Sequence, residues 1–400
     1  MISILQNATI ESLLSETITG EWGIMSTGET GVKVIRTTNF TNEGKLNLDN
    51  VAIRDIPQDI INRKKLRYED IILEKSGGSD NFSVGRVIYF DLKPKEEYLC
   101  NNFTQILRID SKKAYSKYVF YYLFYQHKIG VVKNFQNKTT GIRNLQTKRY
   151  LAQKIPTPSI DVQRKIASIL DKCESARAKR KEASRLTDEF LRSVFFDMFG
   201  DPVGNTRQWA VDKVKNICSA ESGGTPSTKK KKYWEKGKIP WLGSTCCKNN
   251  FVRESKSYIT KEGLENSSAK IFKKKTVIVA LVGATIGKTG FLEFDSTTNQ
   301  NIAGLYPLKD DRIIPEYLFF TIQFLYPHFL ALSRSGFKMA NLAFIRNLSI
   351  PLPPKEIQKK FAGIVQKVEQ LKQKQRESER ELNNLFNSLM QKAFKGELVG

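Results

Sequence analysis

The chain contains IPTPSIDVQRKIASILDKCE at residues 155–174 and the related sequence IPLPPKEIQKKFAGIVQKVE at residues 350–369. The similarity continues without a gap to Phe199 and Phe394, at a constant offset of 195 residues. Identical pairs along the alignment include Pro156 with Pro351, Gln163 with Gln358, Lys165 with Lys360, and Glu174 with Glu369. So long a match at one offset indicates an internal duplication, and a duplication sets the organisation of the whole chain.

Each copy predicts one long helix. Prolines bar a helix before about Asp161 and Glu356, because proline pushes the residue before it out of the helical region. Apolar residues then recur at steps of three and four, the heptad pattern of helices that pair side by side. The expected pairing positions are Ile166, Ile169, Phe190 and Val194 in the first helix, and Phe361, Ile364, Leu371, Leu382, Leu385 and Leu389 in the second. Arg180 and Gln375 interrupt this pattern, either to set the register or as part of a solvated stretch.

A region of mixed character precedes each helix. Short β-like runs such as VKVIRTTNF (32–40) and TVIVALVGAT (276–285) alternate with turn residues. Each region ends in an aromatic helical segment and a glycine-containing loop. The sequence thus predicts the α+β class, with two similar globular domains, two long helices and an internal pseudo-two-fold repeat. The expected boundaries are 1–155 and 201–350 for the domains, and 156–200 and 351–400 for the helical spacers.

The composition indicates a polyanionic partner. Lys and Arg total 65 against 41 Asp and Glu, for a net charge of +24. Such an excess favours nucleic acid, because each phosphate neutralised by a basic side chain releases condensed counterions. We expect no secretory signal, no run of residues is long and apolar enough to span a membrane, and five cysteines without a CxxC pair are typical of reduced thiols in the cytoplasm. With only two histidines, His127 and His328, neither a metal site nor histidine-based catalysis is expected.

Two glycine-containing turns carry basic residues. The string from Gly283 to Thr289 resembles a phosphate-binding loop, but three residues separate its glycines where that loop needs four. We interpret it as a hairpin whose Lys288 approaches a DNA backbone, and an analogous turn in the first domain carries Lys75 and Arg86. No dinucleotide-type glycine loop and no Asn/Asp-Pro-Pro-aromatic string is present, so no catalytic residue is predicted.

Other DNA contacts are expected on loops. The run Lys229, Lys230, Lys231 and Lys232 forms either phosphate contacts or a solvated loop, and lysine supplies charge rather than base identity. Thr225, in the neighbouring SGGTPST segment, is a further candidate contact. The candidates for base reading are Arg36, Thr37, Asn39, Arg143, Asn144, Ser244, Thr245, Lys338 and Asn341. For the three asparagines the alternative role is turn formation, which asparagine supports unaided.

Several strings in fixed order carry a family resemblance. They are GGTPS (223–227), IPWL (239–242), VGATIGKTG (282–290) and NQNIAGLYP (299–307). They resemble the recognition domain of type I restriction–modification specificity subunits, and IPLPPKEIQKKFAGIV (350–365) resembles the helical spacer of that family. The resemblance covers essentially the whole chain. The first domain departs from it, since STGETGVKVIRTTNFTNEGKL (26–46) lacks the Gly-Gly-Thr-Pro opening.

The resemblance implies how such a chain works. Each recognition domain would bind one half of a split double-stranded DNA target, and the two helices would pair as an antiparallel coiled coil that spaces the halves. Two modification (methyltransferase) subunits carrying S-adenosylmethionine would dock on this frame and methylate adenine. Restriction subunits would add translocation and cleavage driven by ATP and Mg²⁺. The chain itself would then be non-catalytic and need no cofactor.

Two other classes of function compete with this interpretation. The chain could be a DNA methyltransferase or nuclease in its own right, which would require a cofactor loop or a carboxylate cluster that the sequence does not show. Alternatively, it could be a coiled-coil scaffold whose charge serves a different acidic partner. The salt dependence of DNA binding separates these classes, because a scaffold would show no steep dependence. The bases read and the length of the gap are not encoded in any recognisable pattern.

Overall fold

The computed structural model describes residues 7–26, 31–79, 83–93, 96–139, 142–308, 312–334 and 340–398. The chain divides into two compact units. Unit 1 contains residues 1–180 together with 378–400, and unit 2 contains residues 181–377. The divisions fall inside the two long helices rather than at their ends, because each half of a helix packs against a different domain.

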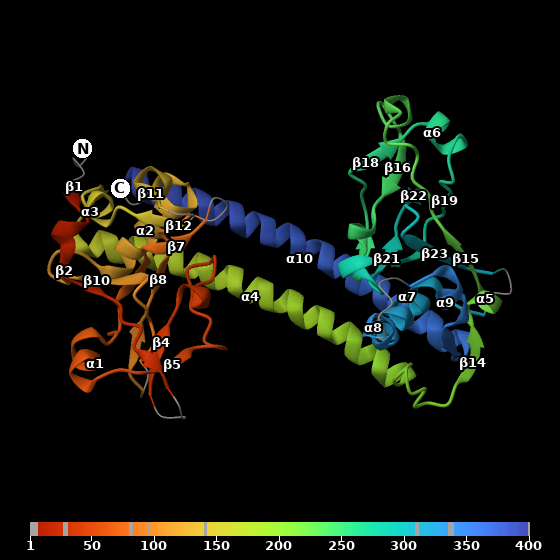
Figure 1. The fold of residues 1–400 in the computed structure, drawn as a ribbon, viewed down its shortest axis with the longest axis horizontal. Coiled ribbons are helices and arrows are strands. Elements are labelled where there is room, and N and C mark those ends of the chain that lie inside the picture. The colour runs from red at the N-terminus through yellow and green to blue at the C-terminus, as the bar shows by residue number, and fades with distance from the viewer. Residues whose placement is uncertain are drawn as a thin grey trace. The chain divides into compact units, whose positions relative to one another are not determined.

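Unit 1 is built from two four-stranded sheets and smaller strand groups (Figure 1). The first sheet has the antiparallel order β2 (Leu14–Thr19), β10 (Thr104–Ile109), β6 (Ile71–Glu74), β8 (Val87–Tyr89). The second has the order β3 (Ile24–Met25), β5 (Ala52–Asp55), β4 (Val32–Ile35), β9 (Tyr98–Cys100), in which β4 and β9 are parallel. The remaining strands are β11 (Gln136–Thr139), β12 (Ile142–Leu145) and β7 (Ser76–Gly78) in one group, and β1 (Asn7–Thr9) with β13 (Lys154–Pro156) in another. The short helices are α1 (Gln58–Lys64), α2 (Ser116–Lys128) and α3 (Thr147–Leu151).

Unit 2 repeats this plan with a larger first sheet. That sheet has the order β15 (Cys218–Ser222), β23 (Ile302–Pro307), β20 (Val277–Ala280), β21 (Thr289–Leu292), β17 (Asn250–Val252). The second has the order β18 (Ser257–Ile259), β16 (Ile239–Leu242), β22 (Ser296–Thr298), β19 (Ile271–Phe272), with β16 and β22 parallel. The strands β14 (Ala210–Lys213) and β24 (Ser349–Leu352) form a separate pair. The short helices are α5 (Val214–Ile217), α6 (Lys261–Glu265), α7 (Pro315–Phe324), α8 (Tyr326–Arg334) and α9 (Leu342–Asn347).

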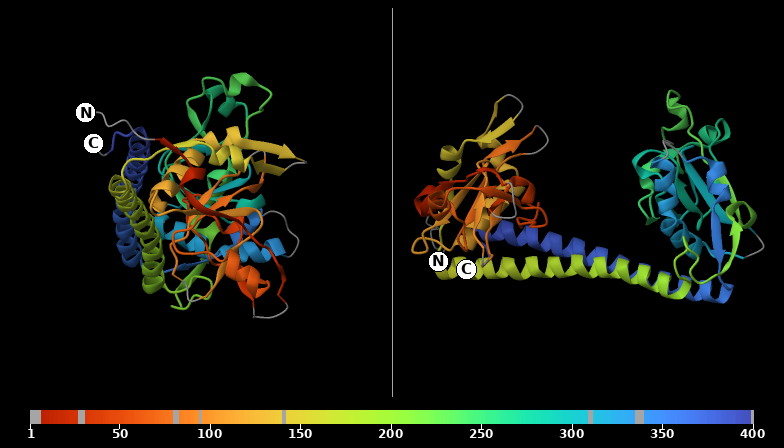
Figure 2. Two further views of the ribbon diagram at one scale, coloured as in Figure 1. Left: turned by 90° about the vertical axis from the view of Figure 1, so that its left-hand side faces the viewer. Right: turned by 60° about the horizontal axis from the view of Figure 1, so that its bottom comes forward.

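The two long helices are α4 (Ile160–Phe199) and α10 (Lys355–Lys395). They run side by side within each unit (Figure 2). In unit 1, Arg177 Nε donates to Asn383 Oδ1 at 2.7 Å. The positions 195 residues away form the matching contact in unit 2, where Lys372 pairs with Asp188 at 2.5 Å. Residue numbers rise along α4 as they fall along α10, so the pairing is antiparallel. The predicted class, with two α+β domains and two long paired helices, is confirmed.

The residues that are identical in the two repeats hold each helix on its domain. In unit 1, Gln163 Oε1 accepts the Tyr115 N–H at 2.9 Å, and the Tyr118 hydroxyl donates to the Pro156 carbonyl at 2.8 Å. In unit 2, Gln358 Oε1 accepts the Ile314 N–H at 2.9 Å, and the Tyr317 hydroxyl donates to the Pro351 carbonyl at 2.9 Å. Both glutamines are fully buried. A buried amide left without partners costs about 1–3 kcal/mol, which explains why the same residues recur.

The terminal aromatic residues of the long helices enter the two domain cores. In unit 1, Phe394 lies among Tyr118, Tyr122 and Tyr125 of α2, with ring centroids 5.2 to 5.7 Å apart. In unit 2, the repeat-related Phe199 packs against Tyr317 at 4.7 Å. In each unit one hydrophobic cluster therefore combines residues of the domain with residues of both long helices.

The predicted pairing positions are partly wrong. Ile166 and Phe361 are buried, and Val194, Ile364 and Leu389 pack on the cores, while Ile169 and Leu382 are half-buried. Phe190, Leu371 and Leu385 are instead 52%, 48% and 50% exposed. The buried positions beside them are Leu170, Leu191, Phe195, Val365, Phe386 and Met390. Each helix must face its domain as well as the other helix, and this turns the buried stripe by one residue.

Gln375 resolves one of the alternatives left open by the sequence. Its side chain is buried in unit 2, where Nε2 donates to Thr187 Oγ1 at 2.9 Å. It is therefore a polar contact inside the helix pair and not part of a solvated stretch.

Within the described part of the chain, no helix combines the length and apolar character needed to cross a bilayer.

Candidate nucleic-acid interface

Loops that follow strand ends are linked to one another in unit 2. They are 223–226 after β15, 243–247 after β16, 299–301 after β22, and 281–288 between β20 and β21. The Gly224 N–H donates to the Thr298 carbonyl at 2.8 Å, and the Asn299 N–H donates to the Leu242 carbonyl at 3.0 Å. The Leu281 N–H donates to the Asn301 carbonyl at 2.9 Å. We call these four loops the loop edge of unit 2.

Unit 1 has the same backbone frame. The Glu21 N–H donates to the Cys100 carbonyl at 2.7 Å, and the Asn101 N–H donates to the Ile35 carbonyl at 2.9 Å. The Lys75 N–H donates to the Phe103 carbonyl at 2.9 Å. The loop edge of unit 1 is accordingly formed by 20–22, 36–40, 101–103 and the described parts of 75–86. The duplication thus extends into the domains, where the sequences have diverged too far to show it.

One glycine explains the missing motif of the first domain. A Cβ on Gly223 would lie 2.2 Å from Thr298 Oγ1, so only glycine fits the first position of Gly-Gly-Thr-Pro. The position with the same backbone bond in unit 1 is Gly20, where a Cβ would lie 2.1 Å from the Asn101 carbonyl oxygen. The sterically required glycine is therefore kept in both domains. The second glycine is replaced by Glu21, so the motif is not recognisable in the sequence.

The turn after β4 carries three of the residues that the sequence predicts to read bases. Asn39 is 3% exposed, and its Oδ1 accepts the Arg36 N–H at 2.9 Å. Its amide group donates to the carbonyls of Asn47 and Asn50 at 2.9 and 3.0 Å. These bonds use the side chain to fix the turn, contrary to the prediction that it reads a base. Arg36 and Thr37 are half-buried on the same turn, and Arg36 also bonds to Asn50.

Arg86 is a structural residue, contrary to its predicted phosphate contact. Its guanidinium forms two bonds to the buried carboxylate of Glu74, at 2.9 and 2.6 Å. It also donates to the carbonyls of Thr37 at 3.0 Å and Phe40 at 3.2 Å. Arg86 thereby connects the turn after β4 to strand β6 of the first sheet.

Lysines remain available on both loop edges. Lys75 is half-buried and has no ion-pair partner among the described residues, and burial is the main cause that lowers its pKa. Lys288 lies at the position equivalent to Arg86. The Lys288 carbonyl accepts the N–H of Ala280, the last residue of β20, and the Arg86 carbonyl accepts the N–H of Glu74, the last residue of β6. In the described part of unit 2, no carboxylate pairs with Lys288. Its charge is free to meet an anion.

The loop edge of unit 2 carries hydroxyl and amide groups. Ser244 is half-buried and Thr245 exposed, both on the turn after β16. Thr225 Oγ1 donates to Gln300 Oε1 at 2.5 Å, and this fixes the amide of the exposed Gln300 at the edge. Gln300 is not among the contacts predicted from the sequence, although it lies in the NQN string directly after a buried strand.

The lysine run is not uniform. Lys232 pairs with Glu262, and this hydrogen bond raises the pKa of Lys232. Lys230 Nζ contacts the Tyr233 hydroxyl at 3.2 Å. Lys229 and Lys231 are exposed and have no partner among the described residues. Figure 1 shows that the segment carrying β16, β18 and α6 lies at the end of unit 2 remote from α10.

The remaining candidates belong to the last loop before each long helix. Arg143 and Asn144 are half-buried on β12, opposite Gly78 and Ser76 of β7, and Asn144 accepts the Ser76 hydroxyl. Asn341 caps α9, where its Oδ1 accepts the Phe344 N–H at 2.8 Å. This supports the turn-forming role for Asn341. Lys338 lies outside the described residues.

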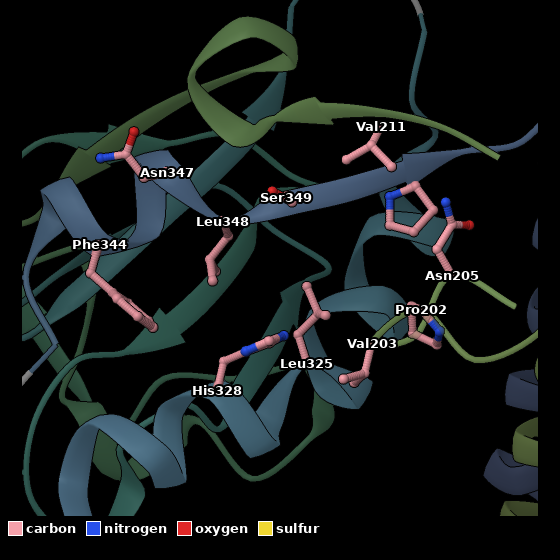
Figure 3. A pocket seen from close by; sticks show the side chains of 11 residues that line it. Pro202, Val203, Asn205, Val211, Leu325, His328, Phe344, Asn347, Leu348 and Ser349 are labelled. Carbon is pink, nitrogen blue, oxygen red and sulfur yellow. The ribbon is translucent and has the colours of Figure 1, made fainter. Parts of the chain in front are cut away.

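A pocket in unit 2 lies away from the loop edge. Its volume is about 310 Å³, and Figure 3 shows Val203, Leu325 and Phe344 around it together with His328. The lining is mainly apolar and includes no carboxylate. No group of three or more His, Cys, Asp or Glu side chains within the described ranges is placed to hold a metal ion.

These features define a class of protein: two domains of one design, each with an edge of loops that presents lysine, hydroxyl and amide groups. The family model described as "Type I restriction modification DNA specificity domain" matches residues 26–185 and 206–384. The chain therefore belongs to the type I restriction–modification DNA specificity family. As a specificity subunit it is responsible for DNA sequence recognition, and it is a targeting rather than a catalytic component.

Named relatives agree with this assignment. The chain is 25% identical over 309 residues to the type I restriction enzyme EcoR124I/EcoR124II specificity subunit of Escherichia coli, which covers 73% of this chain and 72% of the relative. It is 27% identical over 199 residues to the type I restriction enzyme MjaIX specificity subunit of Methanocaldococcus jannaschii, and this match covers 48% of this chain and 44% of the relative.

Solved structures show the same fold. The S subunit of a type I restriction–modification system from M. genitalium superposes with a TM-score of 0.61 at 16% identity, covering 97% of this chain and 96% of that one. A chain from a study of complex assembly and conformational transition of the type I system gives a TM-score of 0.58 at 17% identity, covering 98% of both.

Proposed function

We propose that this chain recognises a bipartite, gapped DNA target, with the domain of unit 1 contacting one half and the domain of unit 2 the other. The observation that carries the proposal is the repeated loop edge, which has one backbone frame and two different sets of side chains. At equivalent positions unit 1 has Thr37 and Asn102 where unit 2 has Ser244 and Gln300. A shared frame with different hydrogen-bonding groups suits two modules that read different sequences.

The side chains divide between positioning and reading. We assign phosphate contacts to Lys75, Lys229, Lys231 and Lys288, since none of the side chains of these four candidate lysines has a hydrogen-bond or ion-pair partner in the described residues. Base contacts fall to the hydroxyl, amide and guanidinium groups of Arg36, Thr37, Thr225, Ser244, Thr245 and Gln300 at the loop edges, and to Arg143 on β12. Lys338 and Asn144 stay predictions without further support.

The chain acts in the cytoplasm within a larger assembly. We infer that two modification subunits supply S-adenosylmethionine and the methyl transfer, and that restriction subunits supply the ATP- and Mg²⁺-dependent reactions. This chain then binds no cofactor of its own. The support is membership of the family, together with a structural neighbour that comes from a study of type I complex assembly.

Mapping of methylated bases in cells that express the assembled system tests the proposal. We expect a motif with two defined halves separated by about one turn of DNA, roughly 34 Å between centres. Replacing Ser244 and Thr245 by alanine should relax only one half of that motif. A short uninterrupted motif, or a change in both halves, would contradict the assignment of one half to each domain.

A further inference from the structure

An aromatic side chain lies on the loop edge of unit 1. The segment 101–104 is a tight turn in which Thr104 donates to the Asn101 carbonyl twice, from its N–H at 2.9 Å and from its hydroxyl at 2.7 Å. Asn101 and Thr104 are buried, whereas Asn102 and Phe103 at the tip are exposed. Phe103 is 43% exposed and has no aromatic partner among the described residues. The turn therefore presents one amide group and one phenyl ring at the edge.

Neighbouring segments hold Phe103 in place. Its carbonyl accepts the Lys75 N–H at 2.9 Å and the Ser76 N–H at 3.2 Å. Its ring lies beside Gly77, where a Cβ would be 3.7 Å from Phe103 Cδ2. Gly77 belongs to β7, and β7 pairs with β12, which carries two of the candidate base contacts. Phe103 thus lies where the loop edge meets these strands, on a backbone that is fixed before any ligand binds.

Unit 2 has the same turn with a different side chain at this position. The Leu281 N–H donates to the Asn301 carbonyl at 2.9 Å. This bond corresponds to the one from Lys75 to Phe103, so Asn301 is the equivalent of Phe103. Asn301 is polar and half-buried. The exposed apolar group is therefore a feature of unit 1 that the duplication did not keep in unit 2.

The place of Phe103, and not its exposure alone, points to a role. Single exposed phenylalanines are common on protein surfaces and need no explanation. Phe103, however, lies on an edge whose other exposed groups are hydrogen-bonding side chains and lysines. A phenyl ring gains nothing from a phosphate oxygen. The apolar group that the base edges present in the major groove is the C5-methyl group of thymine, which apolar side chains contact.

We propose that Phe103 contacts the methyl group of a thymine in the half-target of unit 1 and so selects thymine at one position. The inference rests on the proposed function and adds to it a specificity-determining residue and its base. The amide of Asn102, the preceding residue, suits the hydrogen-bonding edge of an adenine, so the two tip residues together fit DNA that contains A·T pairs. Unit 2 has Gln300 and Asn301 at these positions, and its half-target should lack the corresponding methyl contact.

The test removes the methyl group from the DNA and the ring from the protein. Duplexes of the mapped target are made with deoxyuridine in place of each thymine in turn, which deletes the methyl group and keeps the base pairing. Fluorescence anisotropy with the full chain, assembled with its modification subunit, measures the affinities. One substitution in the unit 1 half-target should weaken binding about fourfold, which is the contribution of one buried methyl group. Phe103→Ala should bind the thymine and uracil duplexes alike at that position.

Two further variants serve as controls. Phe103→Leu keeps an apolar side chain and should retain part of the difference between thymine and uracil. Changing Ser244 and Thr245 to alanine alters the loop edge of unit 2, so it should leave that difference intact and identify the half-target of unit 1 as the unaffected half. The urea midpoint of Phe103→Ala should match that of the unchanged chain, because the ring is exposed.

The outcomes separate this inference from the proposed function. A Phe103→Ala variant that keeps the full difference between thymine and uracil would overturn the inference, as would a unit 1 half-target without thymine. An equal loss of affinity for both duplexes would also overturn it, because the ring would then contact DNA elsewhere, as a wedge between base pairs does. If the Ser244 and Thr245 variant still relaxes one half of the motif, the proposed function stands whatever Phe103 does.

Discussion

Arg86 and Lys288 occupy the same position in two related hairpins and have different roles. The Arg86 guanidinium is bound to Glu74 and to two carbonyl groups, while the Lys288 ammonium has no carboxylate partner in the described residues. An arginine that forks onto a buried carboxylate can hold several backbone groups at once, which a lysine cannot do. The same hairpin therefore stabilises the fold in unit 1 and exposes a charge in unit 2.

This difference predicts opposite effects of two alanine substitutions. Arg86→Ala leaves the Glu74 carboxylate buried without a partner and should lower the free energy of unfolding of unit 1 by about 3 kcal/mol. Lys288→Ala should leave stability unchanged within about 0.5 kcal/mol and weaken DNA binding. Urea denaturation and fluorescence anisotropy with a duplex measure the two effects. Equal stability of both variants would show that the Arg86–Glu74 pair does not hold the domain together.

A second prediction concerns the lysine run. Only Lys229 and Lys231 are without partners in the described structure, so changing these two to alanine should flatten the plot of log affinity against log salt by up to about 1.8. Changing Lys230 and Lys232 should have a smaller effect, because the Glu262 carboxylate already offsets the charge of Lys232, while Lys230 contacts the Tyr233 hydroxyl. All DNA sequences should be affected alike. A change in which sequence is preferred would contradict a phosphate contact.

At the scale of elements, the long helices are shared between two kinds of partner. A heptad pattern predicts burial at two positions in seven, but α4 and α10 also cover the domain cores. The buried stripe is therefore wider and turned relative to the pattern. Phe190 and Leu191 show the result, since they are adjacent on α4 and are 52% and 1% exposed.

These two neighbours form a matched pair for experiment. Leu191→Ala removes buried apolar volume and should destabilise unit 2 by about 2–5 kcal/mol. Phe190→Ala should cost less than about 1 kcal/mol, because half of its surface already contacts water. Thermal or urea unfolding of the full chain measures both. If Phe190→Ala destabilised the chain more than Leu191→Ala, Phe190 would face the core. That is the arrangement that the heptad pattern of the sequence predicts.

At the scale of the whole molecule, the duplication makes each domain depend on both long helices. The core of unit 1 includes Phe386 and Met390 of α10, which come from the far end of the chain. The repeat-related residues of α4 are Leu191 and Phe195. A chain that ends at residue 200 therefore carries a set of side chains that could fill the same place in a second copy.

We expect residues 1–200 to form a two-fold dimer rather than a monomer. In the monomer the buried side of Ile166 and Cys173 would face water, and a closed dimer is the simplest way to cover it. Sedimentation measures the association. With its modification subunit, such a dimer should methylate a palindromic gapped site made of one half-target twice. A well-folded monomer, or methylation of the original asymmetric site, would contradict equivalent half-units.

The candidate interface could be predicted only in part. Thr37, Ser244 and Thr245 were candidate contacts from the sequence, and the structure places them in the turns that follow the parallel strands β4 and β16. The turn at Thr37 was not predicted, because the β-like run expected at 32–40 extended through it. The bonds of Asn39 and Arg86 join residues far apart in the chain, and no local pattern shows them. Gln300 was missed because an exposed glutamine beside a strand has no distinctive spacing, and only the tertiary structure places its loop at the edge, where it bonds to Thr225.

By itself the sequence determined the duplication, the two long helices, the α+β class and the attraction to a polyanion. Repeat spacing, proline positions, apolar periodicity and net charge are properties of the chain that need no knowledge of its contacts. Only the tertiary structure decided which face of each helix is buried, which glycine is sterically required, and which basic side chains are free. Those outcomes depend on the packing of segments separated by up to two hundred residues, because a side chain becomes available for DNA only when no partner inside the fold has taken its charge or its hydrogen bonds.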